Sequence, residues 1–464
     1  MQLTCIGHQS WSVTAGCTHL LIDPVLGGCF GSDPLRSFHI IPFRTVSVAR
    51  MPAVDAIIFT TEHLQHFSPL TLVQLKNLYP DKLNTTRVYV PELIPQVARD
   101  MIQQCGFEVR TIDMQQDFSV GELDCRFYMP CSDVLFWDSR VASVYLRDSN
   151  RHALFIQSDT RIADSFYEDV NAGRVPAPNV MVVTNNFQTS AEGYSIGLDN
   201  LLPVADPKYA RISGLRLLNE IVTKPSRRLE AAVTLLIAGN GYVDAGYKIR
   251  HLWSNSQLAQ IASQLSLLRT VQALAPGERL EVGRTSCVDR AEWINLEEVS
   301  PLEVASIMPE WKGDQLSLSE VKAHLDTMAK TWLITGYGQV LMAQTQYLGR
   351  PLGARKLVIQ LSGEGEKSVD FVMDISRVEF IPVESSGAFA IKQYPFGIRV
   401  DYRDFGRLIM GELQIWELIN LSASQWYVCD RYDSPLAFWL EFYNEQVDYD
   451  RAARSYQLAL ASGS

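Results

Sequence analysis

The sequence predicts an α/β protein in three parts: a layered sandwich of sheets and helices over residues 1–255, a helical connector over residues 256–330, and a smaller α+β domain over residues 331–464. Short apolar runs alternate with helical patterns throughout the first part, which is typical of sheets covered by helices. Amphipathic helical patterns replace them from about Gln257, and a β-rich stretch follows from Lys356. A chain of 464 residues is also too long for one ordinary core, so several domains are expected.

The first elements are predicted from their turn and capping signals. Leu3–Ile6 and Thr18–Ile22 alternate like strands, and Asp23-Pro24 ends the second one on a loop. Ala56–Phe59 is a short apolar run bounded by polar residues, which indicates a buried strand. A helical pattern follows from Ser68 to Leu78, with Ser68 as N-cap and Pro69 as the first helical residue.

The alternation of strand and helix continues to the end of the first part. A helix is predicted over Ile94–Gln104, and strands over Arg87–Val90, Val109–Ile112, Leu123–Met129, Ala142–Leu146, Ala153–Gln157, Val180–Thr184 and Val233–Ile237. Because strands outnumber helices and the helices flank them, a layered sandwich is favoured over a single open sheet.

The second half has a different pattern, and the boundary is expected between residues 255 and 300. Helices are predicted over Leu258–Ala273, Leu318–Met328 and Lys330–Thr345, and again over Phe405–Met410 and Ile415–Leu421. Strands are predicted over Lys356–Leu361, Ser368–Asp374, Arg377–Pro382, Ala388–Lys392, Gly397–Tyr402 and Trp426–Val428. Such a sheet, with one apolar face, would be covered by the helices.

Charge and composition exclude several classes of partner. The net charge is −11 and no run of Lys or Arg occurs, so a nucleic-acid partner is not expected. No stretch approaches the roughly 20 apolar residues of a membrane helix, and the N-terminus does not resemble a signal peptide. The eight cysteines are scattered without a Cys-x-x-Cys pair, which suits a reducing compartment. We therefore expect a cytoplasmic protein without a membrane partner.

The most informative segment for function runs from Ile57 to Ser68. A predicted strand ends there in a loop that carries His63 and His66, and a helix follows directly. Loops at strand ends, held by the sheet beneath them, commonly carry binding and catalytic residues. The residues alone leave two interpretations open, namely metal ligands or polar side chains that pack and hydrogen-bond.

This segment resembles the signature His-x-His-x-Asp-His of the metallo-β-lactamase superfamily, which implies an αββα fold. In that register His63 and His66 match two ligands, whereas Thr61 replaces a His and Gln65 replaces the Asp. Ile6-Gly7-His8 and Leu21-Ile22-Asp23-Pro24 are similar to the opening of the lactonase-like branch. Asp159, in Ser158-Asp159-Thr160, matches the carboxylate that bridges two metals in the family.

The resemblance also implies that the metal motif is degenerate. The loop 129–133 stands where a further ligand His is expected but has none, and residues 185–245 contain no His. Because Gln and Thr are poor ligands, a dinuclear centre is not expected. At most one zinc or iron ion remains, with His63, His66 and Asp159 as its ligands. His8 and Asp23 are interpreted as structural, since Asp-Pro after a strand is ordinary turn chemistry.

The second half resembles two known arrangements over residues 330–445. One is the C-terminal part of CMP-N-acetylneuraminate hydroxylase-like proteins, with Gly411, Trp416-Glu417-Leu418 and Tyr443-Asn444 in similar places. The other is the sterol carrier type-2-like fold, which encloses an apolar tunnel. Those hydroxylases also carry a Rieske cluster, but here the Cys and His pairs (Cys5 with His8, Cys17 with His19) come in reverse order, so neither the cluster nor the oxygenase activity is expected.

Two functions remain open, with a slight preference for the enzyme. In the first, an atypical metal-dependent hydrolase-like enzyme acts on a small polar or nucleotide-like substrate, with His66 and Asp159 as catalytic residues and a metal-bound water that attacks an ester, lactone or phosphoester. In the second, a non-catalytic descendant serves as a binding or assembly module. Glu62 is expected to point away from His63, because side chains alternate in extended chain. The oligomeric state is left open.

Overall fold

The computed structural model describes most of the first half of the chain and much of the second. The described residues are 1–32, 38–80, 85–132, 134, 136–185, 199–200, 218–229, 233–239, 241–243, 253–265, 270–284, 287–297, 316–333, 356–363, 368–374, 377–385, 394, 396–415, 417–418, 425–428, 442–443 and 448–461. The predicted strand Ala388–Lys392 and most of the predicted helix Lys330–Thr345 lie outside these residues.

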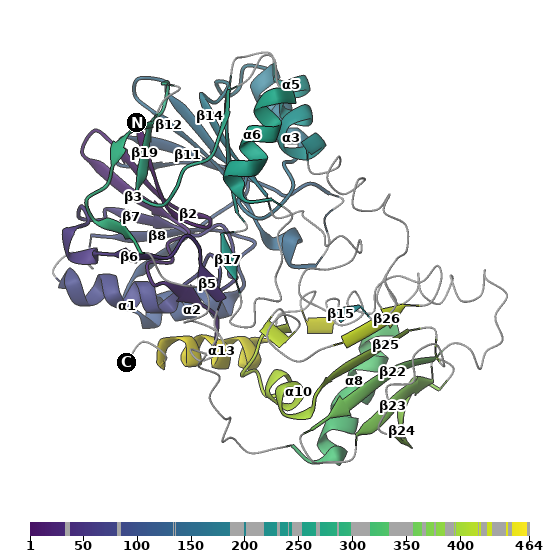
Figure 1. Ribbon diagram of the computed structural model, residues 1–464. Coiled ribbons are helices and arrows are strands. Elements are labelled where there is room, and N and C mark those ends of the chain that lie inside the picture. Colours follow the sequence, from purple (N-terminus) through teal and green to yellow (C-terminus); the bar gives the residue numbers. More distant parts are fainter. Residues whose placement is uncertain are drawn as a thin grey trace.

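Two large sheets form the first half (Figure 1). The first sheet has the order β20 (Cys287–Arg290), β19 (Glu278–Glu281), β1 (Gln2–Gly7), β2 (Ser10–Ala15), β3 (Thr18–Ile22), β7 (Ala56–Ile58), β8 (Arg87–Pro91) and β9 (Glu108–Ile112). The second has the order β10 (Asp117–Val120), β11 (Leu123–Tyr128), β12 (Ser143–Asp148), β13 (Ala153–Ile156), β14 (Val180–Thr184), β16 (Thr234–Ala238) and β18 (Thr270–Gln272). Both sheets are mixed, with antiparallel strands at one side and parallel strands at the other.

The buried residues fall into layers that identify the architecture. One apolar cluster joins side chains of both sheets, among them Trp11, Val13, Phe127 and Leu154, so the sheets face each other across a shared core. A second cluster packs the other face of the first sheet against α1 (Pro69–Leu78), α2 (Gln96–Gln104) and α13 (Tyr449–Ala461). A third packs the second sheet against α3 (Asp164–Asn171) and α6 (Asn255–Leu265). The order helix, sheet, sheet, helix confirms the predicted αββα sandwich.

Local signals placed the first helix correctly. Helix α1 begins after Ser68, whose hydroxyl oxygen accepts a hydrogen bond of 3.1 Å from the backbone N–H of Thr71. Pro69 occupies the first turn, where its missing N–H costs nothing. Strand β2 was not predicted, although it lies between β1 and β3 and pairs antiparallel with both. Polar and apolar residues alternate along Ser10–Ala15, but almost all of them are buried. The alternation therefore does not separate an exposed face of the strand from a buried one.

The sandwich continues beyond residue 255, where the sequence placed its boundary. Strand β18 pairs with β16, and β19 pairs with β1, so segments from the expected helical connector complete both sheets. The predicted helix Leu258–Ala273 is shorter in the structure, where α6 ends at Leu265 and β18 begins at Thr270. Whether an apolar run at the edge of a sheet forms a strand or a helix depends on the segment that it pairs with or packs against. Periodicity alone does not reveal that segment. Helix α13, from the chain's end, also joins this unit.

The C-terminal part is an α+β unit, which also includes α8 (Leu318–Leu333) from the expected connector and β15 (Asp199–Asn200) from the first half of the chain. Its sheet has the order β15, β26 (Gln425–Val428), β25 (Phe396–Asp401), β22 (Lys356–Ser362), β23 (Val369–Asp374) and β24 (Glu379–Glu384). Helices α8 and α10 (Tyr402–Ile409) pack on it around one apolar core that includes Leu325, Ile359 and Phe405. Asp401 caps α10 through the backbone N–H groups of Arg403 and Asp404. The similarity to a sterol carrier stays a prediction.

Smaller elements complete the described structure. The strands β4 (Cys29–Phe30), β5 (Phe38–Ile40) and β17 (Tyr242–Val243) form a three-stranded sheet, and β6 (Arg44–Val46) pairs with β21 (Ile294–Leu296). Short helical turns lie at Val48–Arg50 and Phe136–Arg140, and Asn219–Thr223 leads into α5 (Lys224–Arg228). Within the described residues, no helix combines the length and the apolar character needed to cross a membrane.

Candidate functional site

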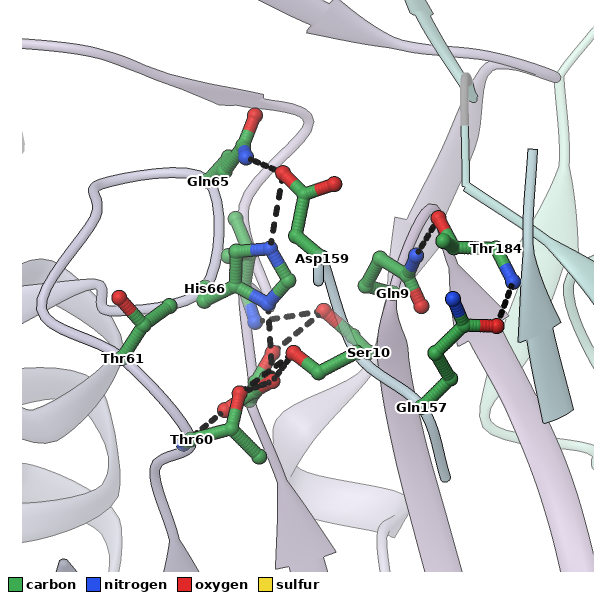
Figure 2. Close-up of polar contacts among 12 residues, drawn as sticks. Gln9, Ser10, Thr60, Thr61, Gln65, His66, Gln157, Asp159 and Thr184 are labelled. Carbon is green, nitrogen blue, oxygen red and sulfur yellow. Dashed lines mark hydrogen bonds and ion pairs between the residues drawn. The ribbon is translucent and has the colours of Figure 1, made fainter. Parts of the chain in front are cut away.

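The candidate site lies where strands of both sheets end. Strands β3 and β7 are parallel neighbours, with Ile22 opposite Ile58, so Asp23 and the loop after β7 leave the first sheet side by side. Strand β13 ends at Ile156, and Ser158 and Asp159 follow it from the second sheet. The two sheets thus bring the loop 60–66 and Asp159 together at one end of the sandwich (Figure 2).

Asp23 is the centre of the hydrogen-bond network. Its side chain is buried, and it accepts hydrogen bonds from the Thr60 backbone N–H (2.7 Å to Oδ1) and the Thr60 hydroxyl (2.5 Å to Oδ2). The Thr60 hydroxyl also contacts Ser158 Oγ at 2.6 Å, and Ser158 lies 3.4 Å from Asp23 Oδ2. One carboxylate therefore ties together the ends of β3, β7 and β13.

His66 lies between two carboxylates. Its Nδ1 is 2.8 Å from Asp23 Oδ2. Its Nε2 faces Asp159 Oδ2 at 3.8 Å (Figure 2). The side chain is completely buried. Burial opposes the charged imidazolium, but the charge of Asp23, the hydrogen bond to Asp23 and the charge of the nearby Asp159 outweigh it and raise the pKa of His66 to about 9. The ring is thus held in one orientation with Nε2 towards Asp159.

Asp159 has a second partner in the loop. The side-chain amide of Gln65 donates a hydrogen bond to Asp159 Oδ2, the same oxygen that faces His66 (Figure 2). The Asp159 side chain is 12% exposed, which makes it the most accessible part of this cluster. Gln65 thus supplies a neutral donor where the resemblance would place a metal-binding Asp.

Hydrogen bonds beside the cluster hold the strand ends, and one of them crosses between the two sheets. Gln9, in the turn between β1 and β2, donates from Nε2 to the Thr184 hydroxyl at 2.9 Å, and the backbone N–H of Thr184 donates to Gln157 Oε1 at 3.0 Å (Figure 2). Ser10 Oγ donates to the backbone oxygen of Asp23 at 2.7 Å. These buried bonds fix the distance between the sheet ends that carry Asp23 and Asp159.

His63 faces a different environment. Its Nε2 lies 3.6 Å from Glu62 Oε1, and Arg140 Nε donates to the same oxygen at 2.8 Å. Burial lowers the pKa of His63 to about 4, and the neighbouring Glu62 only partly opposes that effect. Burial alone would raise the pKa of Glu62, but His63 and Arg140 hold it below its usual range.

The expected orientation of Glu62 away from His63 is therefore wrong. The prediction assumed that the chain stays extended after β7, but its backbone already bends at Thr60 and Glu62. A turn then follows at residues 64–66, where the backbone N–H groups of His66 and Phe67 both donate to the His63 oxygen, at 2.8 and 2.7 Å. Side chains do not alternate in a turn, so neighbouring residues can face each other. The Thr61 hydroxyl, at the first ligand position of the motif, donates to Glu62 Oε2 at 3.1 Å.

The described residues do not fit a shared metal ion in this arrangement. Of the three predicted ligands, the structure brings His66 and Asp159 together, whereas His63 Nε2 lies 3.6 Å from Glu62 Oε1. In the part of the chain that the structure describes, no group of three or more His, Cys, Asp or Glu side chains is placed to hold a metal. The Gln65 amide also occupies the Asp159 oxygen that a ligand role would need. A metal bound by His63, His66 and Asp159 stays a prediction.

The structural role predicted for Asp23 extends beyond the turn that the sequence indicated. Asp23 was interpreted as a turn residue, and its φ of 47° is indeed typical of a turn. The structure adds that its carboxylate binds His66, as the second carboxylate of the cluster. The available signal was its position directly after a strand, at the edge where the histidine loop also begins. Arg140 gave no signal, because 78 residues separate it from its partner Glu62.

A cavity of about 90 Å³ lies on the His63 side of the loop. The sandwich contributes Glu62, His63 and Arg140 to its wall, helix α13 contributes Arg451 and Tyr456, and the C-terminal α+β unit contributes others, among them Leu413 and Tyr443. His66 and Asp159 do not line it. The cavity and the Asp23–His66–Asp159 cluster are therefore separate features on either side of one loop.

Comparison with known proteins gave matches among solved structures alone. No family model matches the chain, and neither does any curated protein. The isothiocyanate hydrolase from Delia radicum gut bacteria is 17% identical, with a TM-score of 0.39 over 61% of this chain and 98% of its own. The metallo-β-lactamase fold protein YhfI from Bacillus subtilis is 14% identical, with a TM-score of 0.36 over 60% of this chain and 99% of its own.

A third match is CmlA, a diiron β-hydroxylase from Streptomyces venezuelae. It is 16% identical, with a TM-score of 0.37 over 60% of this chain and 53% of its own. At such identities and TM-scores, no residue role or activity is transferred from these proteins to this chain. The site is interpreted from its own geometry.

Proposed function

We propose that the protein is an atypical hydrolase-like enzyme that acts on a small polar substrate and uses His66 and Asp159 for proton transfer. The observation that carries this proposal is the line of three side chains, with His66 Nδ1 2.8 Å from Asp23 and Nε2 3.8 Å from Asp159. Asp23 orients the imidazole, and an imidazole beside a carboxylate can donate and accept the protons that hydrolysis requires. The Nε2–Oδ2 distance exceeds a hydrogen bond, which leaves these two atoms able to share a reacting group.

In this proposal, a substrate reaches the reacting atoms from the side of Asp159 that faces the histidine loop. His66 is fully buried and Asp159 is 12% exposed, so a substrate or water would meet Asp159 first. Gln65 is then the residue that a substrate displaces, since its amide donates to Asp159 Oδ2. The substrate class, an ester, lactone or phosphoester of a small polar or nucleotide-like molecule, follows from the proposed chemistry and the resemblance to the lactonase-like branch.

Turnover of a panel of small esters, lactones and phosphoesters tests this proposal. His66→Gln and Asp159→Asn should each lower kcat/KM by at least about 100-fold, the usual contribution of a positioned acid or base. The matched control is His152→Gln, since His152 is 40% exposed and pairs with Asp148 at the turn between β12 and β13. Activity retained in both site variants would refute the assignment.

Elemental analysis of protein purified without added metal tests the predicted ion separately. Zinc or iron near one equivalent that disappears in a His63→Ala, His66→Ala double variant would support the mononuclear hydrolase. Retention of the metal in that variant would refute these ligands. Turnover that survives a chelator would favour the metal-independent acid–base pair.

The alternative is a non-catalytic binding module, and one observation favours it. The cavity beside His63 is lined by both parts of the chain, including Arg140 and Arg451, and it is separate from the Asp23–His66–Asp159 cluster. A wild-type protein that turns over no substrate of the panel, yet gains thermal stability with a small charged molecule, would favour this function. Loss of that gain in Arg451→Gln would place the molecule in the cavity.

We also propose that the protein is cytoplasmic and that it is related to the lactonase-like or hydroxylase-like branch. Cys5, Cys17, Cys29, Cys105 and Cys125 carry free thiols, which supports a reducing compartment. A small-molecule substrate rather than nucleic acid is supported by the net charge of −11.

A further inference from the structure

Helix α13 is the last element of the chain, yet it packs on the first domain (Figure 1). Tyr456 and Ala459 are buried in the cluster that also holds side chains of α1 and α2. Tyr449 donates a hydrogen bond from its hydroxyl to Asp100 Oδ2 at 2.7 Å, and Asp100 belongs to α2. The helix layer behind the candidate site is thus completed by a segment from the far end of the sequence.

One side chain of α13 contacts both ends of the histidine loop. The hydroxyl of Tyr456 donates to the backbone oxygen of Glu62 at 3.2 Å. Its ring packs against that of Phe67, with the centroids 5.2 Å apart and the planes at 66°. Glu62 and Phe67 directly flank the segment from His63 to His66, and Tyr456 is only 1% exposed.

The remaining contacts of Glu62 and Phe67 extend this restraint. The Glu62 carboxylate accepts from Arg140 Nε at 2.8 Å and from the Thr61 hydroxyl at 3.1 Å, so Glu62 is held at both its backbone and its side chain. Phe67 packs in turn on Phe59 at the end of β7, with centroids 5.0 Å apart. The turn between Glu62 and Phe67 depends on the His63 backbone oxygen, which accepts hydrogen bonds from the backbone N–H groups of both His66 and Phe67.

We propose that Tyr456 is a positioning residue for His66, so that the C-terminal helix completes the site that the sandwich begins. This inference rests on the proposed function, since it assigns Tyr456 a role in the same reaction. Tyr456 holds the Glu62 end of the loop by a hydrogen bond and the Phe67 end by ring packing. His66 then stays aligned with Asp159 because the turn cannot shift relative to the two sheets.

The experiment compares two variants that make the same chemical change on the same helix. Tyr456→Phe removes the hydroxyl and keeps the ring. Tyr449→Phe does the same at a residue that is 46% exposed and bonded to α2 rather than to the loop. Backbone hydrogen exchange is measured by mass spectrometry on peptides that cover residues 60–67. We expect exchange there to rise about fivefold in Tyr456→Phe, the effect of one lost hydrogen bond, and to stay unchanged in Tyr449→Phe.

Turnover gives the second measurement. We expect Tyr456→Phe to lower kcat with KM nearly unchanged, because a misaligned His66 affects the reaction more than binding. Tyr456→Ala should lower kcat further, since it also removes the packing on Phe67. Exchange in residues 60–67 that is the same in Tyr456→Phe as in wild type refutes the positioning role, whatever the turnover. Absence of turnover in the wild type would refute the proposed function alone, because the exchange measurement does not depend on it.

Discussion

Replacement of Asp23 by Ala should destabilise the sandwich strongly. The change removes the acceptor of the Thr60 backbone N–H at 2.7 Å and of His66 Nδ1 at 2.8 Å. It also removes the acceptor of the Thr60 hydroxyl, which keeps Ser158 Oγ as a partner at 2.6 Å. Each unsatisfied buried group costs about 1–3 kcal/mol, and water that enters the vacated space recovers part of the loss. We expect a decrease of about 4 kcal/mol in the free energy of unfolding, a large share of the roughly 5–15 kcal/mol that is typical of a domain.

Equilibrium unfolding in urea, followed by circular dichroism, measures this loss. Asp23→Asn is the informative companion, because its carbonyl can still accept from Thr60, and we expect a loss of about 2 kcal/mol. The control is Asp124→Ala, since this carboxylate is 57% exposed and pairs with Arg147 on the surface at 2.6 Å. Such a surface pair should contribute less than about 1 kcal/mol. An Asp23→Ala protein within about 1 kcal/mol of wild type would refute the network as a determinant of the fold.

Two further predictions concern other parts of the chain. Burial and the nearby Arg451 lower the pKa of His324 to about 4. Below about pH 6.5 the unfolded chain therefore takes up a proton at His324 that the folded chain does not. The stability that this residue contributes is complete above that pH and is lost as the pH falls towards 4. The wild type should lose up to about 3 kcal/mol more than His324→Gln between pH 7 and pH 4, measured by urea unfolding at each pH, and equal losses would contradict the assignment. Ser68→Ala removes the hydroxyl that caps α1 through Thr71 and should cost about 1 kcal/mol in the same assay, with Ser68→Thr as the conservative control.

Much of the fold could be predicted from local sequence, and the reason is physical. The α1 cap at Ser68 and the strands before and after it depend on residues within a few positions, so their signals survive in the sequence. Strand β2 was overlooked although its polar and apolar residues alternate as in a strand. The boundary near residue 255 could not be placed from periodicity, since β18 and β19 gain their conformation by pairing with β16 and β1.

The candidate site was found in part by sequence and completed by packing. The position of two histidines after a buried strand drew attention to His63 and His66, and the resemblance to the metallo-β-lactamase signature added Asp159. Only the tertiary structure decided that His66 lies between the carboxylates of Asp23 and Asp159, while His63 lies beside Glu62. These choices depend on which strand ends meet and on how the loop turns.

The role of the C-terminus was invisible in the sequence. Tyr456 and Glu62 are 394 residues apart, and nothing in the neighbourhood of either residue indicates the other. A sequence records the local preference of each segment for helix, strand or turn. Contacts between distant segments are decided by burial in a common core, which exists only once the sheets have packed and α13 has covered α1 and α2.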